Sequence, residues 1–200
     1  MPTGGRLTPL APLNTWTGMS AFVGPVNDEL NGIVQVQLGE NDLSVVTAGL
    51  TWDGQLLAPG NKGPIFQARV KVGALLSGER VVIGLMSAYN ATLDSTTRNL
   101  WFRLDGSLVV TIEGDDDTTN TDDKPTGVTL TADTWYWLTI NASDPAAVSF
   151  WIDEQQVGTV AVTAISSGAL QPAILLQKDA TVVDTPYMYI DRVDCLWRRV

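Results

Sequence analysis

The sequence predicts an all-β protein whose strands form an antiparallel two-sheet sandwich. No window carries apolar residues at helical spacing over three turns, whereas alternation of apolar and polar residues at period two recurs throughout the chain. Roughly ten to thirteen such segments, separated by Gly, Asn, Asp and Pro, are typical of an antiparallel sandwich or barrel. A chain of 200 residues fits one domain of this kind.

The N-terminal segment, residues 1–24, is predicted to be an extended arm on a body formed by residues 25–200. It is rich in Pro, Gly and Thr, and its large apolar side chains are isolated. Buried aromatic side chains dominate interface energetics, so these are the candidate partner-binding residues: Trp16, Met19 and Phe22. The alternative is a frayed tail or a first edge strand packed on the body.

The first half of the body shows clear strand patterns. Residues 34–38 and 66–72 alternate apolar and polar side chains, which gives one dry and one wet face, and 81–85 is a short apolar run. Residues 100–104 and 108–112 flank Asp105-Gly106. This pair supplies the positive φ angles of a two-residue type I′ turn, so the segment is predicted to be a hairpin.

The second half carries four more predicted strands, rich in aromatic and β-branched residues: 135–140, 148–152, 174–177 and 187–197. Large side chains that alternate along these strands are expected to fill the space between the sheets. The predicted core members are Trp135, Trp137, Phe150, Ile152 and Trp197, whereas Tyr136 and Trp151 alternate to the opposite face.

An acidic stretch, residues 113–123, contains six of the 22 acidic residues, and without it the net charge of −10 would be −4. Because charges are not buried unpaired, we expect an exposed loop. Its carboxylates are a candidate calcium site, since calcium prefers oxygen ligands: Asp115, Asp116, Asp117, Asp122 and Asp123. Their spacing matches no defined loop, so a solvated loop without metal is the alternative.

Composition excludes several function classes. The chain has no histidine, which removes Ser-His-Asp and Cys-His nucleophiles and histidine–zinc hydrolases, and its one cysteine, Cys195, excludes an internal disulfide. With 12 basic against 22 acidic residues, nucleic acid is not an expected partner. No apolar run reaches membrane-spanning length, and the N-terminus lacks a secretory apolar region, so we expect no membrane and assembly in a cytoplasm.

Three pieces in order carry a family resemblance: residues 134–140, residues 148–153 with Val157-Gly158-Thr159, and residues 189–194 with Trp197. This order resembles the concanavalin A-like lectin/glucanase and laminin-G-like jelly-roll domains over about residues 27–200. Those folds have a "W-x-x-L-x-I" strand, an "F-x-x-D-G" hairpin, a "V-G" strand and a last strand marked "I-D-x-V". Here Glu154-Gln155-Gln156 stands where the family has Asp-Gly. The resemblance implies a jelly-roll sandwich and says little about function.

Glucanases of this fold need two carboxylates on one strand face, about 5–5.5 Å apart for a retaining mechanism. Glu113 and Asp115 have the right spacing but lie where a strand becomes acidic loop. An exposed loop is the opposite of the desolvated pocket that raises a carboxyl pKa, so we expect no catalytic residues, no enzyme activity and no cofactor. A lectin-like domain is the alternative, with aromatic platforms for sugar rings at Trp52, Tyr89 or Trp101.

A compact all-β body without catalytic groups, preceded by an arm, also resembles in type the decoration or cement proteins of tailed bacteriophages. That resemblance implies a non-enzymatic virion protein on the capsid surface, assembled in the host cytoplasm and binding the major capsid protein, with a trimer as the expected homo-oligomer. A carbohydrate-binding module in a phage tail or fibre is the neighbouring hypothesis.

Overall fold

The computed structural model describes residues 21–25, 32–39, 45–52, 58–180 and 182–197. These residues form fourteen strands and three short 3-10 helices. The strands are β1 (Phe22–Pro25), β2 (Val34–Gln37), β3 (Val46–Thr51), β4 (Ala58–Pro59), β5 (Ile65–Val72), β6 (Glu79–Met86), β7 (Arg98–Asp105), β8 (Val109–Asp116), β9 (Asn120–Thr129), β10 (Trp135–Asn141), β11 (Val148–Ile152), β12 (Gln155–Val160), β13 (Ala169–Lys178) and β14 (Tyr187–Leu196). The helices are η1 (Gly60–Lys62), η2 (Leu93–Ser95) and η3 (Thr163–Ser167). Among the described residues, no helix is long and apolar enough to cross a membrane.

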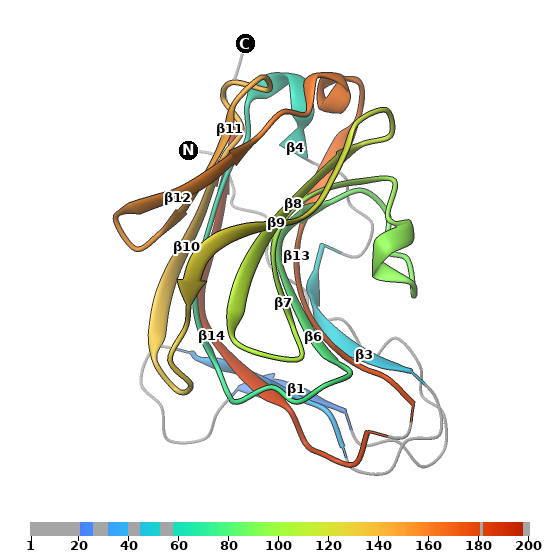
Figure 1. Cartoon of the computed structure of the whole chain (residues 1–200), viewed down its shortest axis with the longest axis vertical. Helices are drawn as coiled ribbons and strands as arrows, with labels where there is room; N and C mark the ends of the chain where they lie inside the picture. The colour runs from blue at the N-terminus through green and yellow to red at the C-terminus, as the bar shows by residue number, and fades with distance from the viewer. Residues whose placement is uncertain (1–20, 26–31, 40–44, 53–57, 181, 198–200) are drawn as a thin grey trace.

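The strands pair into two sheets that lie face to face (Figure 1). The first sheet has the order β1-β2-β14-β5-β10-β11-β12, and the second has the order β3-β13-β6-β7-β8-β9 with β4 also pairing to β13. Neighbouring strands run antiparallel, as in the pairs β5–β10 and β6–β7. The predicted antiparallel two-sheet sandwich is confirmed.

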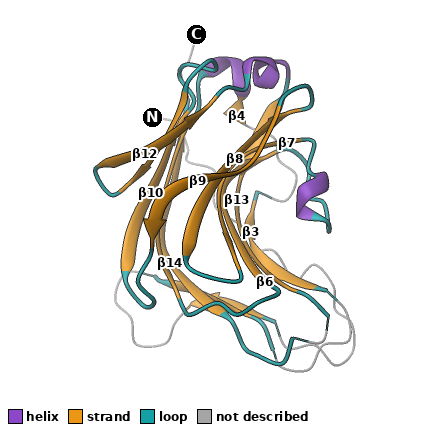
Figure 2. Ribbon diagram, viewed as in Figure 1, coloured by secondary structure: helices purple, strands orange, loops and turns teal. Residues whose placement is uncertain are grey.

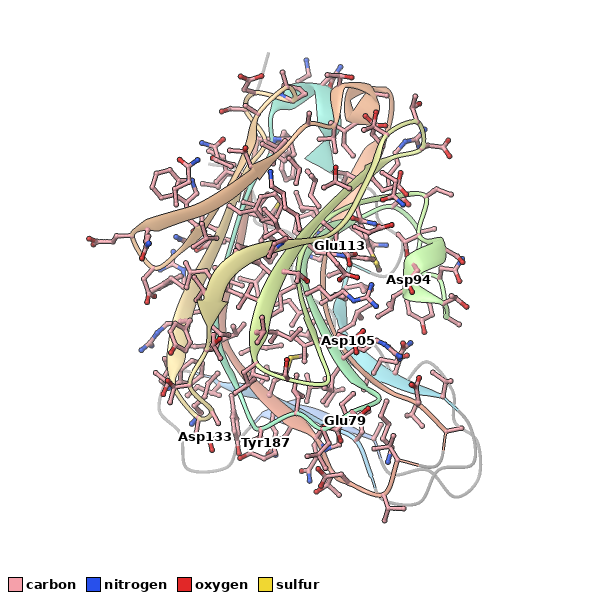
Figure 3. The ribbon with its side chains drawn as sticks, in the orientation of Figure 1. Glu79, Asp94, Asp105, Glu113, Asp133 and Tyr187 are labelled. Atoms are coloured by element: carbon pink, nitrogen blue, oxygen red, sulfur yellow. The ribbon has the colours of Figure 1, made fainter. Side chains whose placement is uncertain are left out.

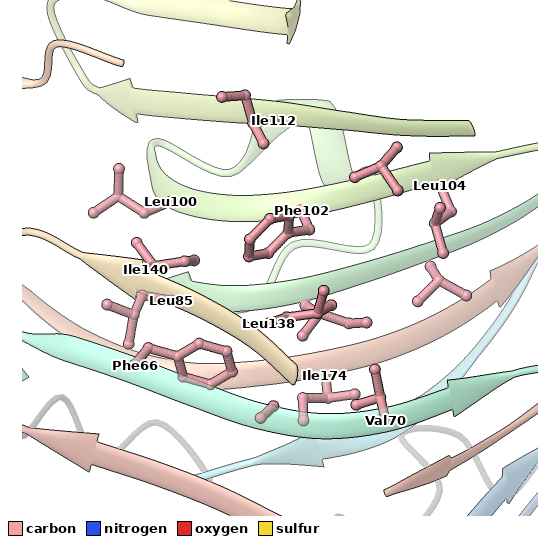
Figure 4. Packing of buried hydrophobic residues seen from close by; sticks show 14 of the residues in the cluster. Phe66, Val70, Leu85, Leu100, Phe102, Leu104, Ile112, Leu138, Ile140 and Ile174 are labelled. Carbon is pink, nitrogen blue, oxygen red and sulfur yellow. The ribbon is translucent and has the colours of Figure 1, made fainter. Parts of the chain in front are cut away.

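The core lies between the sheets and is built mainly from alternate residues of strands in both sheets (Figure 4). Leu138 and Ile140 of β10 and Phe150 of β11 meet Phe102 of β7, and each is at most 1% exposed. The rings of Phe102 and Phe150 meet edge to face with centroids 5.2 Å apart. Removal of these inward-facing side chains from water is the main stabilising contribution to a sandwich.

The prediction of the core is confirmed for Phe150 and Ile152 and wrong for three tryptophans. Because Leu138 and Ile140 point inward, Trp135 and Trp137 lie on the outer face of the first sheet, and Trp197 is 37% exposed. The physical reason is that both faces of β10 carry apolar side chains, so period-two alternation alone does not fix which face is buried. Trp151 lies on the outer face as predicted, whereas Tyr136 packs against the core.

The 100–112 hairpin is confirmed, but its turn is not the predicted two-residue turn. Asp105 remains in β7, the connection covers residues 106–108, and Gly106 takes the positive φ of 60°. A three-residue connection with Gly in the left-handed region is the next most common way to close a hairpin.

The acidic stretch is not a loop as predicted, but a second hairpin. β8 continues to Asp116, β9 starts at Asn120, and Asp117 between them has a φ of 69°. Asp116 is 1% exposed and Glu113 is 2% exposed, which also contradicts the expectation of full exposure. Charges this deep are tolerated because donors surround them, as the next subsection shows.

The predicted boundary between arm and body, at residue 24, falls inside β1, the edge strand that pairs with β2. Phe22 is the first residue of this strand. Trp16 and Met19 lie outside the described residues.

Candidate functional site

The outer face of the second sheet brings together aromatic, basic and acidic side chains from separate segments of the sequence. In β7, Leu100, Phe102 and Leu104 enter the core, so Trp101 and Arg103 point outward. In β8, Ile112 enters the core, and Glu113 and Asp115 fall on the outer face on either side of Gly114. Trp101 and Glu113 are direct partners in the β7–β8 register.

A segment of the chain, residues 87–97, covers part of this outer face. It contains η2, the short helix beside β7 in Figure 2. Leu93 of this helix and Tyr89 pack on a second apolar cluster, separate from the core, that consists of Val82, Met86, Trp101, Ala173 and Leu175. The cover removes water from the centre of the face and leaves polar groups around its margin.

Under this cover lies a buried carboxylate with two donors. Glu113 accepts hydrogen bonds from the Trp101 indole Nε1 at Oε2 and from Arg103 Nη1 at Oε1, the latter at 3.0 Å. Arg103 also donates to Asp94, through Nη1, and to Asp105, through Nη2 at 3.1 Å. Glu113, Asp94 and Asp105 are labelled on the same side of the molecule in Figure 3. One guanidinium is thus shared by three carboxylates.

Burial raises the pKa of Glu113 from 4.5 to about 7, although the Trp101 and Arg103 donors act in the opposite direction and nearby Asp123 adds to the rise. Burial also acts against the charge of Arg103, but its hydrogen bonds and its attraction to Asp94 and Glu113 raise its pKa above the usual value. Arg103 is therefore always charged. Since both oxygens of Glu113 are engaged and the residue is 2% exposed, this carboxyl presents no free oxygen to a ligand.

Next to this network lies an open cavity of about 300 Å³. Its walls come from the covering segment and from the β8–β9 turn, and every side chain that lines it carries an oxygen: Asp94, Ser95, Thr96, Thr97, Asp115, Asp117, Thr118 and Asn120. The volume is at the lower end of the range of small-molecule sites. We refer to it as the acidic cavity.

Two side chains at this cavity have unused hydrogen-bonding capacity. Thr96 is 2% exposed, and its Oγ1 has no hydrogen-bond partner among the described residues. Asp115 uses Oδ1 to accept the backbone N–H of Asp117 at 2.7 Å. Burial, together with the nearby charges of Asp116 and Asp117, raises the pKa of Asp115. A buried hydroxyl without a partner is costly, and such groups in folded proteins are commonly satisfied by ordered water, an ion or a ligand.

The five aspartates predicted as a calcium site do not converge. Asp115 and Asp117 line the cavity, while Asp116 points away and accepts the backbone N–H groups of Thr118, Thr119 and Ala164. Asp122 accepts from Asn120, and Asp123 accepts from Thr111. Among the described residues, no group of three or more His, Cys, Asp or Glu is placed to hold a metal ion.

Two of the three predicted aromatic platforms, Trp101 and Trp52, are buried, and the third, Tyr89, is half-buried. Trp101 is fully buried, Tyr89 packs on the second apolar cluster, and Trp52 is 9% exposed with its ring edge-on to Trp197 at 6.3 Å. Sequence reasoning missed Asp94, Thr96 and Arg103. The sequence did carry one signal for Arg103. Trp101 and Arg103 alternate on a strand whose predicted hairpin partner contains Glu113, and this pairing places an indole and a guanidinium close to a carboxylate.

No family model matches the sequence, and no curated protein matches it. Solved structures do match. A GH16 protein of the Bacteroides ovatus mixed-linkage glucan PUL, in complex with a G4G4G3G product, has a TM-score of 0.63 at 11% identity, covering 87% of this chain and 85% of that one. A glycoside hydrolase family protein from Mycobacterium thermorestibile has a TM-score of 0.59 at 14% identity, over 98% and 94%. The cellulose induced protein Cip1 has a TM-score of 0.56 at 14% identity, over 97% and 91%. These likenesses show the fold: the chain is a concanavalin A-like jelly-roll sandwich.

Proposed function

We propose that this protein is a non-catalytic, lectin-like domain that binds a glycan in the acidic cavity. The observation that supports it most directly is the lining: carboxylates, hydroxyls and an amide, including the buried Thr96 hydroxyl without a partner. Sugar hydroxyls both donate and accept, so they complement a wall of acceptors and hydroxyls. The cavity lies on the outer face of a sandwich shared with glycan-acting proteins, which adds support by analogy of fold.

The charges of the cavity define the ligand class. Asp94 pairs with Arg103, and Asp117 pairs with Arg98 at 3.7 Å. Among the described residues, Asp115 has only the backbone N–H of Asp117 as a donor. A uronate or sulfated sugar would add a negative charge beside these carboxylates. We therefore propose neutral or amino sugars as ligands.

The geometry favours binding over hydrolysis. A retaining or inverting glycosidase needs two carboxyl groups that flank the bond to be broken. Here Asp115 reaches the cavity, but the elevated pKa belongs mainly to Glu113, whose oxygens are held by Trp101 and Arg103. The other two carboxyl groups of the cavity, Asp94 and Asp117, pair with Arg103 and Arg98, so among the described residues Asp115 alone lacks a cationic partner there, and one carboxyl group cannot supply both roles.

The test is calorimetric titration with neutral, amino and uronic oligosaccharides, beginning with a mixed-linkage glucan tetrasaccharide, together with a reducing-sugar assay. Asp115→Asn should weaken binding about tenfold or more, because hydrogen bonds to charged groups contribute roughly 1.5–3 kcal/mol. Thr96→Val should also weaken binding, yet leave the free protein as stable or up to about 1 kcal/mol more stable, since an orphaned buried hydroxyl is removed.

Glu154→Gln, a charge-matched change in the exposed β11–β12 turn, is the control and should leave affinity unchanged. Tight binding of uronates, unchanged affinity in Asp115→Asn, or release of reducing sugar would each contradict the proposal.

A second proposal is that the protein is a structural protein of a bacteriophage virion. The observation that favours it is the composition of residues 1–24, with three prolines and the isolated Trp16 and Met19. In this proposal the arm binds the major capsid protein, and the sandwich faces outward. Co-sedimentation with intact and stripped particles tests it. Deletion of residues 1–20 should abolish co-sedimentation and leave glycan binding intact, and a protein that never co-purifies with particles ends this proposal.

A further inference from the structure

The outer face of the first sheet carries a second cavity, of about 250 Å³. It lies on the opposite sheet from the acidic cavity and has a different lining. Three strands line it: β5 through Ile65, β10 through Thr139 and Asn141, and β11 through Trp151, with Asp153 in the turn that follows. It combines one aromatic ring with three polar side chains, whereas the acidic cavity has no aromatic lining.

The ring at this cavity is held in place. Trp151 lies opposite Thr139 in the β10–β11 register, and its indole Nε1 donates to Ser149 Oγ at 3.0 Å on the same strand. The side chain is half-buried, so part of the ring remains in contact with water. An indole fixed by packing and by its one polar atom offers apolar area at low entropic cost.

Among the described residues, the three polar side chains around the ring each retain a hydrogen-bonding function without a partner. Thr139 Oγ1 accepts from Gln67 Nε2 at 3.0 Å, so its hydroxyl hydrogen is available as a donor. Asn141 Oδ1 accepts the Ser143 N–H at 3.0 Å, which leaves the Nδ2 group as a donor. Asp153 Oδ1 accepts the Trp137 N–H at 2.9 Å, which leaves Oδ2 as an acceptor.

Two donors and one acceptor beside an aromatic surface form the complement of a sugar ring, whose C–H face is apolar and whose neighbouring hydroxyls both donate and accept. We infer that this cavity is a second glycan site, in which one neutral pyranose stacks on Trp151 and bonds to Thr139, Asn141 and Asp153. The inference stands on its own residues and does not depend on the acidic cavity.

Trp137 extends the site along β10. It lies two residues before Thr139, on the same outer face, and about 7 Å along the strand. Trp135, two residues further on, is already covered: the Arg69 guanidinium lies 5.0 Å and the Lys71 ammonium 5.2 Å from its ring centre. No cation of the described residues is placed in this way over Trp137 or Trp151. A glycan chain therefore contacts Trp151 and then Trp137, and stops before Trp135.

The test is titration of the full chain with cellotetraose, maltotetraose and chitotetraose, read by calorimetry and by the indole N–H signals in nuclear magnetic resonance spectra. At least one probe should move the Trp151 indole signal. Trp151→Ala should weaken this site at least tenfold, and Trp135→Ala, the matched control on the same face, should leave it unchanged. Trp137→Ala should weaken the tetrasaccharide but not the corresponding monosaccharide.

If Trp151→Ala fails to fold, Asn141→Asp decides, because it keeps the oxygen that accepts the Ser143 N–H and replaces the Nδ2 donor with an acceptor at nearly constant size; it should weaken binding with an unchanged thermal transition. Asp115→Asn separates the two sites, since it should leave the Trp151 signal shift intact even if the acidic cavity binds nothing. The inference is overturned if no probe moves the Trp151 signal, or if Trp135→Ala and Trp151→Ala lose the same affinity. It is also overturned if the protein self-associates through this face and Trp151→Ala makes it monomeric.

Discussion

Glu113 shows how one residue's surroundings define its role. A glutamate on the outer face of a sheet in a glycanase-like fold is a natural candidate for an acid catalyst, and its pKa of about 7 fits that role. Its partners do not, because the Trp101 indole and the Arg103 guanidinium take both oxygens and the covering segment excludes solvent. We therefore assign Glu113 a structural role: through Arg103 and Asp94 it links β7, β8 and η2.

This assignment predicts a pH dependence of stability. Because the folded pKa is about 7 and the ordinary value is 4.5, the folded protein binds this proton more tightly than the unfolded chain. The wild-type free energy of unfolding should therefore fall relative to that of Glu113→Gln as the pH rises from about 4.5 to 7, and the difference should level off above pH 7. The total change should be on the order of 1–3 kcal/mol.

Urea denaturation of both proteins at half-unit steps of pH measures this difference. Glu154→Gln is the control, because it removes one carboxyl group from an exposed turn without touching this network. A gap between Glu113→Gln and wild type that stays constant from pH 4 to 8 would show that Glu113 titrates normally.

At the scale of strands, Gly84 sets how closely β6 approaches β7. It is opposite Trp101, and a Cβ at position 84 would lie 2.1 Å from the Leu100 carbonyl oxygen and 2.9 Å from Ile140 Cδ1. Glycine in a strand interior often marks such a close approach of two backbones. Trp101, the register partner of Gly84, belongs to the second apolar cluster and donates its indole N–H to Glu113.

Gly84→Ala should therefore destabilise the fold by about 1–3 kcal/mol or more, because β7 has to shift away from β6. Gly158→Ala is a matched control in β12, where the new Cβ would lie 2.6 Å from Ile112 Cδ1, the end of a flexible side chain that can rotate. Its loss of stability in chemical denaturation should be smaller. Equal losses for the two variants would mean that the β6–β7 backbone is not rigid.

Most strands were predictable from the sequence, because a period-two pattern with one dry face needs only local information. Residues 66–72 are an example: Phe66, Ala68, Val70 and Val72 are buried, whereas Gln67, Arg69 and Lys71 between them are only half-buried. The phase of β10 was not predictable, since Trp137 and Leu138 are both apolar and only the opposing sheet decides which of them is buried.

The site was less predictable than the fold. Neither Thr96 nor Asp94 belongs to a motif, and they reach the site only because Leu93 docks η2 on the outer face of the second sheet. The hairpin between β8 and β9 was missed for a related reason. β9 is a polar strand that pairs with β8 through backbone hydrogen bonds, and its composition, with Asp122, Asp123 and Lys124, is typical of a loop.

At the scale of the whole molecule, the acidic residues predicted to lie in one exposed loop are divided between buried and exposed positions. The net charge is −10, and the 113–123 stretch contributes both the buried Glu113 and Asp116 and the exposed Asp117, Asp122 and Asp123. Each of the two proposed sites has at least one aspartate at its margin, Asp115 or Asp153. Both sites therefore favour glycans without carboxylates.

Two sites on opposite sheets predict that one chain can bridge two glycan strands. Addition of wild-type protein to soluble mixed-linkage β-glucan should raise the scattered light, because each chain joins two polymers. Asp115→Asn and Trp151→Ala should each abolish the increase while retaining binding at the other site, and the double variant should lose binding altogether. Sedimentation must first show a monomer, because in the predicted trimer three copies of one site would suffice to bridge. A monomeric Trp151→Ala protein that still cross-links the polymer would show that the first sheet carries no second site.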